Sequence, residues 1–301
     1  MKILIAGATG YIGKQLIPQL EGAGHTIVAL VRKSSSFDSN IKEIVCDLVK
    51  ESPQLPEDID AAYYLVHNMD GQKKFEEFEI RAATHFVDAL KNTSSKQIIY
   101  LSGIANDIRL SRHIRSRLYV EKILKASGIP TTILRSAIVI GKHSTPFVIA
   151  NDLVRRLPVM ITPKWTQNLC QPIAIDDLLY YLINVLNHED CLKQTFDIGG
   201  PDVLSYHNIM HGIASVRGVR RLILPIPLLT PKLSSYWLYL ITSVNFALAS
   251  TLIDNLTTNF VCKDQRINDI IPLKCKSFLE AVKDAIYFEP TVSHEPVLSM
   301  S

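Results

Sequence analysis

The stretch "KILIAGATGYIG", residues 2–13, decides the fold of this chain. Its first residues form an apolar, β-rich run, and Gly7, Gly10 and Gly13 follow in the spacing G-x-x-G-x-x-G where a helix begins. Glycines at this spacing let the backbone turn tightly and approach a pyrophosphate, whose charge is favoured at the helix N-terminus. The order of strand, glycine turn and helix therefore predicts a dinucleotide-binding loop.

Working outward from this loop, short β-rich runs alternate with helical segments over the first two-thirds of the chain. This alternation is typical of an α/β protein with a Rossmann-type, doubly wound parallel sheet. We expect a dinucleotide-binding domain over residues 1–145 and a smaller, substrate-covering α+β region over residues 146–301. The expected strands are residues 2–7, 26–32, 43–46, 61–66, 97–102 and 131–136, and the main expected helices are residues 11–23, 72–90 and 111–126.

Composition excludes several classes of function. The 301 residues include 20% charged residues and have a net charge of +3, which gives no basic field for nucleic acid. Five cysteines lie at wide spacings, so we expect reduced thiols, and we expect no metal site. The apolar start lacks the features of a secretory signal. We therefore expect a cytoplasmic protein, with peripheral membrane contact as the alternative.

The end of the second expected strand bears on the choice of cofactor. A carboxylate there would accept from the ribose hydroxyls of NAD, but this strand ends in Val31, Arg32 and Lys33. A cation at this place binds a 2′-phosphate, so Arg32 favours NADP over NAD. The alternative is that Arg32 is only a solvated charge. Asp47 follows the third strand and is placed either to accept from the adenine amino group or to stabilise a turn.

Several motifs resemble one superfamily. "GATGYIG", "CDL", "YLSG", "ILRSAIVIG" and "IAIDDLLYYL" are similar to those of extended and atypical short-chain dehydrogenase/reductases. "AAYYLVHNM", "LSRHIRSRLYVEKIL", "LPVMITPKW" and "DIGGPDVLSYHNIM" resemble its NAD(P)H-binding branch, which is related to NmrA-like and NAD-dependent epimerase-like proteins. The resemblance covers roughly residues 1–240. It implies an oxidoreductase that binds NADP, with NAD as the alternative, and leaves room for a homodimer.

The resemblance also implies cofactor contacts beyond the three glycines. In the glycine loop it assigns Thr9, Tyr11 and Ile12 to the dinucleotide. At other strand ends it assigns Leu65, Val66 and Ile138, which lie along the ribose or the nicotinamide. On the helix expected over residues 111–126 it assigns Arg117. His67, which follows Val66, belongs to the same strand end. Apolar residues of the later region, Met160, Pro163 and Trp165, either line the ligand or belong to the core.

The helix expected over residues 111–126 carries the catalytic question. In active relatives this helix contains a tyrosine, two further residues, a serine, a lysine, three further residues and a glutamate. Here Ser116 and Glu121 align with the serine and the glutamate, so His113 replaces the tyrosine and Arg117 replaces the lysine. Tyr119 then points away from this face. Ser102 matches the serine that orients a substrate carbonyl in active relatives.

Two interpretations of this helix stay open. Arg117 keeps the cationic role at any working pH, and a histidine with an ordinary pKa of about 6.5 can donate a proton, so Ser102, His113 and Arg117 form a competent catalytic set. An imidazole is shorter than a phenol, however, which favours a dinucleotide-binding regulator or assembly factor without turnover. Epimerase or dehydratase chemistry is a third, less favoured interpretation.

The sequence does not identify the small-molecule substrate. Residues 233–253 form a run without charge, but seven of them are Ser, Thr or Asn, so we expect no integral membrane span.

Overall fold

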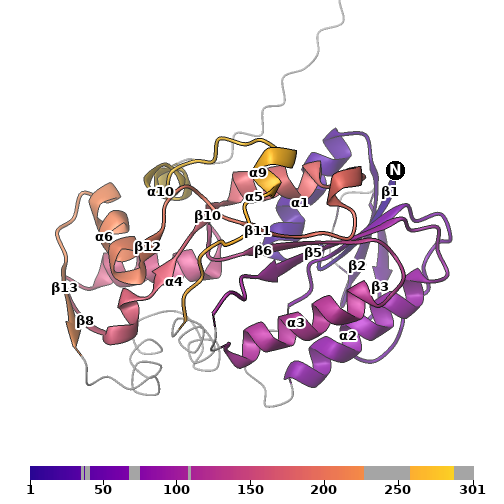
Figure 1. Ribbon diagram of the computed structural model, residues 1–301, viewed down its shortest axis with the longest axis horizontal. Coiled ribbons are helices and arrows are strands. Elements are labelled where there is room, and N and C mark those ends of the chain that lie inside the picture. Colours follow the sequence, from indigo (N-terminus) through magenta and orange to yellow (C-terminus); the bar gives the residue numbers. More distant parts are fainter. Residues whose placement is uncertain (35–36, 38–40, 68–74, 108–109, 227–257, 288–301) are drawn as a thin grey trace, which may run out of the picture.

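A seven-stranded, fully parallel sheet forms the centre of the computed structural model, which describes residues 1–34, 37, 41–67, 75–107, 110–226 and 258–287 (Figure 1). The strand order is β11-β6-β5-β4-β1-β2-β3. The chain reverses direction across the sheet between β1 and β4, where doubly wound proteins bind their ligands. The strands are β1 (Lys2–Ala6), β2 (Thr26–Val31), β3 (Lys42–Val45), β4 (Ala61–Tyr64), β5 (Gln97–Gly103), β6 (Thr131–Ser136) and β11 (Thr195–Ile198).

Helices cover both faces of this sheet, so its central strands are apolar on both sides (Figure 1). Helices α1 (Tyr11–Gly22) and α5 (Ile175–Asn184) pack on one face, over a core that includes Ile3, Ile5 and Phe196. Helices α2 (Phe75–Leu90) and α3 (Arg112–Lys125) pack on the other, over a core that includes Leu4 and Tyr100.

A smaller lobe extends from the β6 and β11 side of the sheet and has a hydrophobic core of its own (Figure 1). Three small sheets join strands within it, and β8 and β13 form a parallel two-stranded ribbon. Its helices and strands, with the remaining short elements, are β7 (Val139–Ile140), α4 (Thr145–Arg156), β8 (Val159–Pro163), η1 (Lys164–Gln167), β9 (Leu169–Cys170), β10 (Ile173–Ala174), η2 (Glu189–Cys191), β12 (Leu204–Ser205), α6 (Tyr206–Val216), β13 (Leu222–Ile226), α9 (Ile267–Ile270) and α10 (Phe278–Tyr287).

The predicted fold class is confirmed, and each of the six strands expected in the first two-thirds is present within a few residues. The domain boundary at residue 145 stays a prediction, although β11 and α5 show that the later region completes the main sheet and its helical cover. The expected start of a helix at Gln72 and the uncharged run of residues 233–253 lie outside the described residues. Within the described part of the chain, no helix has the length and apolar character needed to cross a membrane.

Candidate functional site

The glycine loop, residues 7–13, joins β1 to α1 at the carboxyl edge of the sheet. Gly7 has a φ of +88°, and a Cβ atom there would lie 2.7 Å from the Leu65 carbonyl oxygen at the end of β4. A Cβ atom at Gly13 would lie 2.5 Å from the Gly7 carbonyl oxygen, because α1 packs directly on the loop. The backbone approaches so closely at both positions that neither has room for a side chain.

Gly10 is the N-cap of α1, and no side chain caps this helix. The Gly10 N–H donates to the Gly7 carbonyl oxygen at 2.9 Å, which closes the turn. Gly10 and Thr9 are both exposed. The start of α1 therefore faces outward with uncapped N–H groups, the arrangement that binds a phosphate.

Other residues predicted to contact the cofactor surround this loop. Tyr11 and Ile12 are half-buried, and a Cβ atom at Gly141 would lie 2.0 Å from the Tyr11 hydroxyl oxygen, so this tyrosine packs across Gly141. Burial raises the pKa of Tyr11. The Leu65 N–H donates to the Ala6 carbonyl oxygen at 2.9 Å, and Val66 is half-buried beyond it.

The predicted adenosine side of the site lies beyond β2 and β3. Arg32 and Lys33 are exposed where β2 ends. Asp47 Oδ1 accepts from the Val49 N–H at 3.1 Å, and its Oδ2 lies 3.5 Å from Lys50 Nζ. Asp47 thus stabilises its own turn, and its contact with adenine stays a prediction.

Helix α3 places His113 and Arg117 one turn apart. Ser111 is the N-cap, as expected, and its Oγ accepts from the Ile114 N–H at 3.2 Å. Arg117 Nε donates to His113 Nε2 at 3.2 Å, so the ring proton of a neutral His113 is on Nδ1. Among the described residues, this buried Nδ1 has no hydrogen-bond partner.

Burial and the nearby Arg117 lower the pKa of His113 to about 3, so the ring is neutral at physiological pH. Burial, Arg117 and His113 also lower the pKa of His67 well below its ordinary value. His113 is thus a hydrogen-bond donor through Nδ1 rather than a charged acid, unlike the ordinary histidine assumed in the sequence analysis.

Ser102, at the end of β5, is buried, and its hydroxyl donates to Glu121 Oε1 at 2.7 Å. Arg135, at the end of β6, binds the same carboxylate through two hydrogen bonds of 2.9 and 2.6 Å. We refer to Ser102, His113, Arg117, Glu121 and Arg135 as the α3 cluster. An i, i+4 pair between Arg117 and Glu121 would be expected on an isolated helix, but here Arg135 takes the carboxylate.

Tyr119 lies outside this cluster, as the register predicts. It is 48% exposed, and Lys122 Nζ lies 5.6 Å from the centre of its ring.

Sequence reasoning missed the role of Arg135. The signal was Arg135 itself, the charged residue of the strand "TTILRS", but the sequence of a strand does not identify the partner of such a cation.

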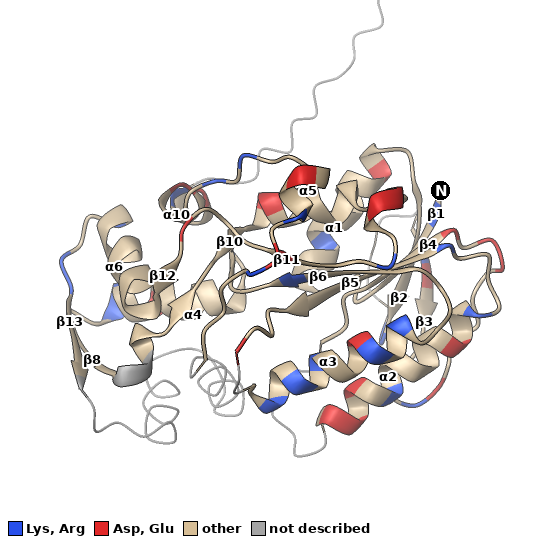
Figure 2. Cartoon of the chain, in the orientation of Figure 1, with Lys and Arg blue, Asp and Glu red and all other residues tan. Residues whose placement is uncertain are grey.

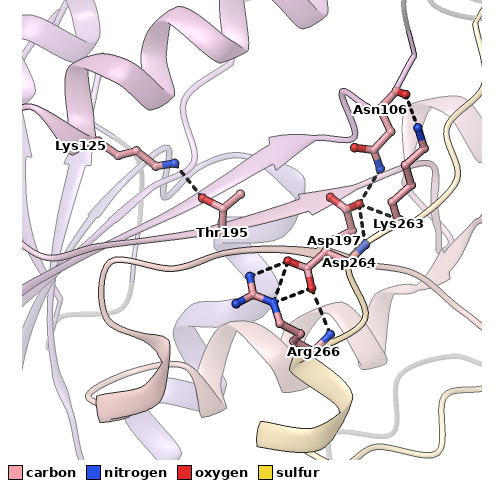
Figure 3. Close-up of polar contacts among 7 residues, drawn as sticks. All are labelled: Asn106, Lys125, Thr195, Asp197, Lys263, Asp264 and Arg266. Carbon is pink, nitrogen blue, oxygen red and sulfur yellow. Dashed lines mark hydrogen bonds and ion pairs between the residues drawn. The ribbon is translucent and has the colours of Figure 1, made fainter.

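The carboxyl ends of β5 and β11 are joined by a polar network that the sequence did not predict (Figure 3). Asp197 Oδ2 accepts from Asn106 Nδ2 at 2.6 Å and from the Lys263 N–H at 2.9 Å. Lys263 Nζ in turn donates to the Asn106 carbonyl oxygen at 2.9 Å. This network ties the segment from residue 258 onward to the same sheet edge as Ser102.

The remaining predicted residues divide between core and site border. Ile138 is half-buried, and its carbonyl oxygen accepts from the Ile173 N–H at 3.0 Å. Met160 and Pro163 are buried, whereas the side chain of Trp165 lies outside the described residues. In the described part of the chain, no group of three or more His, Cys, Asp or Glu residues is arranged to hold a metal ion.

Comparisons with known proteins agree with this geometry. Residues 7–156 match the model of a family described as NAD(P)H-binding. This part of the chain belongs to that family. The NAD(P)H-binding segment contains the glycine loop and the whole α3 cluster, so both regions lie in one recognised unit.

Two curated plant proteins are similar over a longer stretch. Divinyl chlorophyllide a 8-vinyl-reductase of Zea mays is 23% identical to this chain. The aligned region covers 66% of this chain and 55% of the reductase. The chain thus covers about half the length of this reductase. The second is from Arabidopsis thaliana and is the mitochondrial NADH dehydrogenase [ubiquinone] 1 alpha subcomplex subunit 9. It is 22% identical to this chain, over 91% of this chain and 75% of its own length.

Among solved structures, a short-chain dehydrogenase/reductase superfamily protein of Agrobacterium tumefaciens with bound NAD has the same fold. Its TM-score is 0.69 at 12% identity, over 95% of this chain and 97% of that one. The seven-stranded sheet and its helices therefore have the Rossmann fold seen in that protein.

Proposed function

We propose that this protein is an NADP-dependent oxidoreductase that reduces a small carbonyl-type substrate, with Ser102, His113 and Arg117 forming the site. The main support for the proposal is the buried His113 Nδ1, which has no hydrogen-bond partner among the described residues. The same ring is fixed by the hydrogen bond that its Nε2 accepts from Arg117. A buried donor without a partner costs free energy unless a ligand satisfies it.

The glycine loop and the α3 cluster fit the cofactor that the family binds. The uncapped start of α1 receives the pyrophosphate, and Arg117 provides a cation beside the ribose. When bound, NADPH would supply the hydride for reduction of a substrate carbonyl carbon. Negative charge then develops on the substrate oxygen, where the His113 N–H and the Arg117 guanidinium stabilise it, and water supplies the proton.

The state of His113 shapes this mechanism. With its pKa lowered to about 3, the ring is not an acid that loses a proton near neutrality. A neutral imidazole can still polarise a carbonyl through its N–H, the role given to a histidine with a lowered pKa in triosephosphate isomerase. Ser102 acts here as a positioning residue, because its hydroxyl is held by Glu121.

Arg32 and Lys33 support NADP as the cofactor. Both are exposed at the end of β2, where an NAD-selective site carries a carboxylate. An arginine at this place can bind a 2′-phosphate through two parallel N–H groups.

The test begins with the binding of NADPH and NADH to the full chain, followed by NADPH oxidation with a panel of aldehydes, ketones and conjugated carbonyls. We expect tighter binding of NADPH and turnover with at least one class of carbonyl. Turnover should be lost in His113→Phe and retained in Tyr119→Phe, whose ring is exposed. Loss of activity in Tyr119→Phe alone would contradict the assignment.

A second candidate function is a dinucleotide-binding regulator or assembly factor that does not turn NADP over. The bond from Ser102 to Glu121 favours it, because a serine that orients a substrate carbonyl needs a free hydroxyl. The similarity to a respiratory complex subunit over 91% of the chain points the same way. Retained NADPH binding without turnover of any carbonyl, together with weaker binding in Arg117→Ala, would support this candidate over the enzyme.

A further inference from the structure

The ribbon of β8 and β13 carries apolar residues on both of its faces. On the inner face, Met160 and Ile223 are buried in the core of the smaller lobe. The outer face consists of four aliphatic residues, each between 44% and 54% exposed, which are Val159, Ile161, Leu222 and Leu224. A strand with one solvated face normally alternates apolar and polar residues, so this outer face departs from the usual pattern.

The four residues, which we call the aliphatic face, form two pairs across the ribbon. The register places Leu222 beside Val159 and Leu224 beside Ile161. Residues two apart on a strand point to the same side, so the pairs lie next to each other and form one continuous patch. Contiguous exposed apolar patches mark surfaces that bind a partner, whereas scattered apolar residues do not.

Basic residues gather at the end of the ribbon where both strands begin. Arg155 and Arg156 end α4 just before β8, and Arg220 and Arg221 come directly before β13 (Figure 2). In the loop between α6 and β13, Figure 2 shows blue residues and no red ones. Over residues 145–163 and 204–226 the sequence contains five arginines and one carboxylate, that of Asp152.

Part of this charge is available to a ligand. Arg221 Nε is bound to the Val154 carbonyl oxygen at 2.5 Å, which fixes the end of α4. Arg155 and Arg156 share Asp152 at 3.3 Å and are 57% and 43% exposed, and Arg220 is exposed as well. Arg155 and Arg220 therefore place exposed positive charge beside the aliphatic face.

We propose that the aliphatic face and the arginines at its end dock this protein onto the surface of a bilayer rich in anionic phospholipid. Aliphatic side chains enter the acyl boundary, while the arginines bind phosphate oxygens of the headgroups. The net charge at the end of the aliphatic face is positive, which is complementary to an anionic headgroup surface.

The first experiment is co-sedimentation of the full chain with vesicles of phosphatidylcholine, with and without phosphatidylglycerol. We expect binding only when phosphatidylglycerol is present, and a decline with added salt because screening weakens the arginine contacts. Binding to both kinds of vesicle alike, or to neither, would overturn the proposal.

Variants separate the two halves of the surface. The double variant Val159→Thr/Leu222→Thr keeps β-forming residues and should weaken binding about tenfold or more, since two half-exposed aliphatic side chains no longer enter the bilayer. Arg220→Gln should weaken it about fivefold, the value of one cation near an anionic surface. The matched controls are Leu169→Thr, at a residue 43% exposed in β9, and Arg81→Gln on α2, which should bind as the unmodified chain does.

A last measurement distinguishes a bilayer from another protein surface. All variants should bind NADPH equally, which shows that they are folded. If the unmodified chain forms a dimer that Val159→Thr/Leu222→Thr converts to a monomer, and vesicles do not bind, the face is an interface between copies of this chain and the proposal is wrong.

Discussion

The glycine loop and the α3 cluster lie at the same edge of one sheet, yet they are built in opposite ways. In the loop the backbone packs closely, as Gly7 does against the Leu65 carbonyl oxygen, and the site needs only the absence of side chains. The α3 cluster is held by side-chain contacts among residues of β5, α3 and β6, centred on the buried Glu121 carboxylate and its partner Arg135. A backbone site tolerates many surroundings, whereas a side-chain site depends on each neighbour, and this difference predicts how each region responds to mutation.

The largest effect is expected in the loop. Gly10→Val should weaken NADPH binding at least about 1000-fold, which is about 4 kcal/mol, because the side chain occupies the place of the pyrophosphate. The fold should persist, since the nearest atom to the new Cβ would be the Gly7 carbonyl oxygen at 3.1 Å. Calorimetric titration measures the affinity. Gly22→Val, near the end of the same helix with nothing within 4 Å, is the control, and unchanged binding in Gly10→Val would place the cofactor elsewhere.

The next effect concerns the α3 cluster and rests on the proposed enzyme. His113→Phe should lower kcat/KM by about 10²–10³, the value of one donor to a developing oxyanion. Tyr119→Phe should leave the rate within about twofold, because it removes only an exposed hydroxyl. Steady-state kinetics with the substrate found in the carbonyl panel tests both. The comparison breaks down if the two variants are equally active.

The buried, neutral His113 of the α3 cluster also makes stability depend on pH. His113 has a pKa of about 3 when folded and about 6.5 when unfolded, so below pH 6.5 the unfolded chain binds a proton that the folded chain does not. Its stabilising contribution is complete above about pH 6.5 and falls by up to about 1.4 kcal/mol per pH unit as the pH drops towards 3.

Urea unfolding of the original chain and of His113→Phe at pH 7, 6 and 5 measures this dependence. The difference between their free energies of unfolding should change with pH, since other titrating groups, His67 among them, are shared by both chains. A constant difference would mean that His113 is not neutral and buried in solution.

The smallest effect is expected at the exposed rim of the loop region. Arg32→Asp should reduce the preference for NADPH over NADH about tenfold, because it replaces a partner of the 2′-phosphate with a like charge. Titration of both nucleotides measures the ratio. Lys42→Asp, at an exposed residue of β3, makes the same charge change and should leave the ratio unaltered. Equal affinity of the original chain for both nucleotides would exclude Arg32 as the selecting residue.

Much of the sheet side of the molecule could be predicted. Strand β1, the glycine spacing and the N-cap Ser111 are local features, because a strand period, a turn and a cap are each set within a few residues. The position of His113 on one helix face with Arg117 followed from the helix repeat. The helix repeat also allows Arg117 to pair with Glu121, but it says nothing of Arg135 on β6, which binds the Glu121 carboxylate.

The sequence by itself determined the alternation of strands and helices, the loop without side chains and the register of α3, because each depends on contacts between near neighbours. Tertiary structure alone decided the partner of Glu121, since Arg135 reaches it only when β6 lies beside β5. It also decided the neutral state of His113, because a pKa depends on burial and on charges brought near by folding. The aliphatic face likewise exists only after β13 pairs with β8, two segments that are distant in the chain.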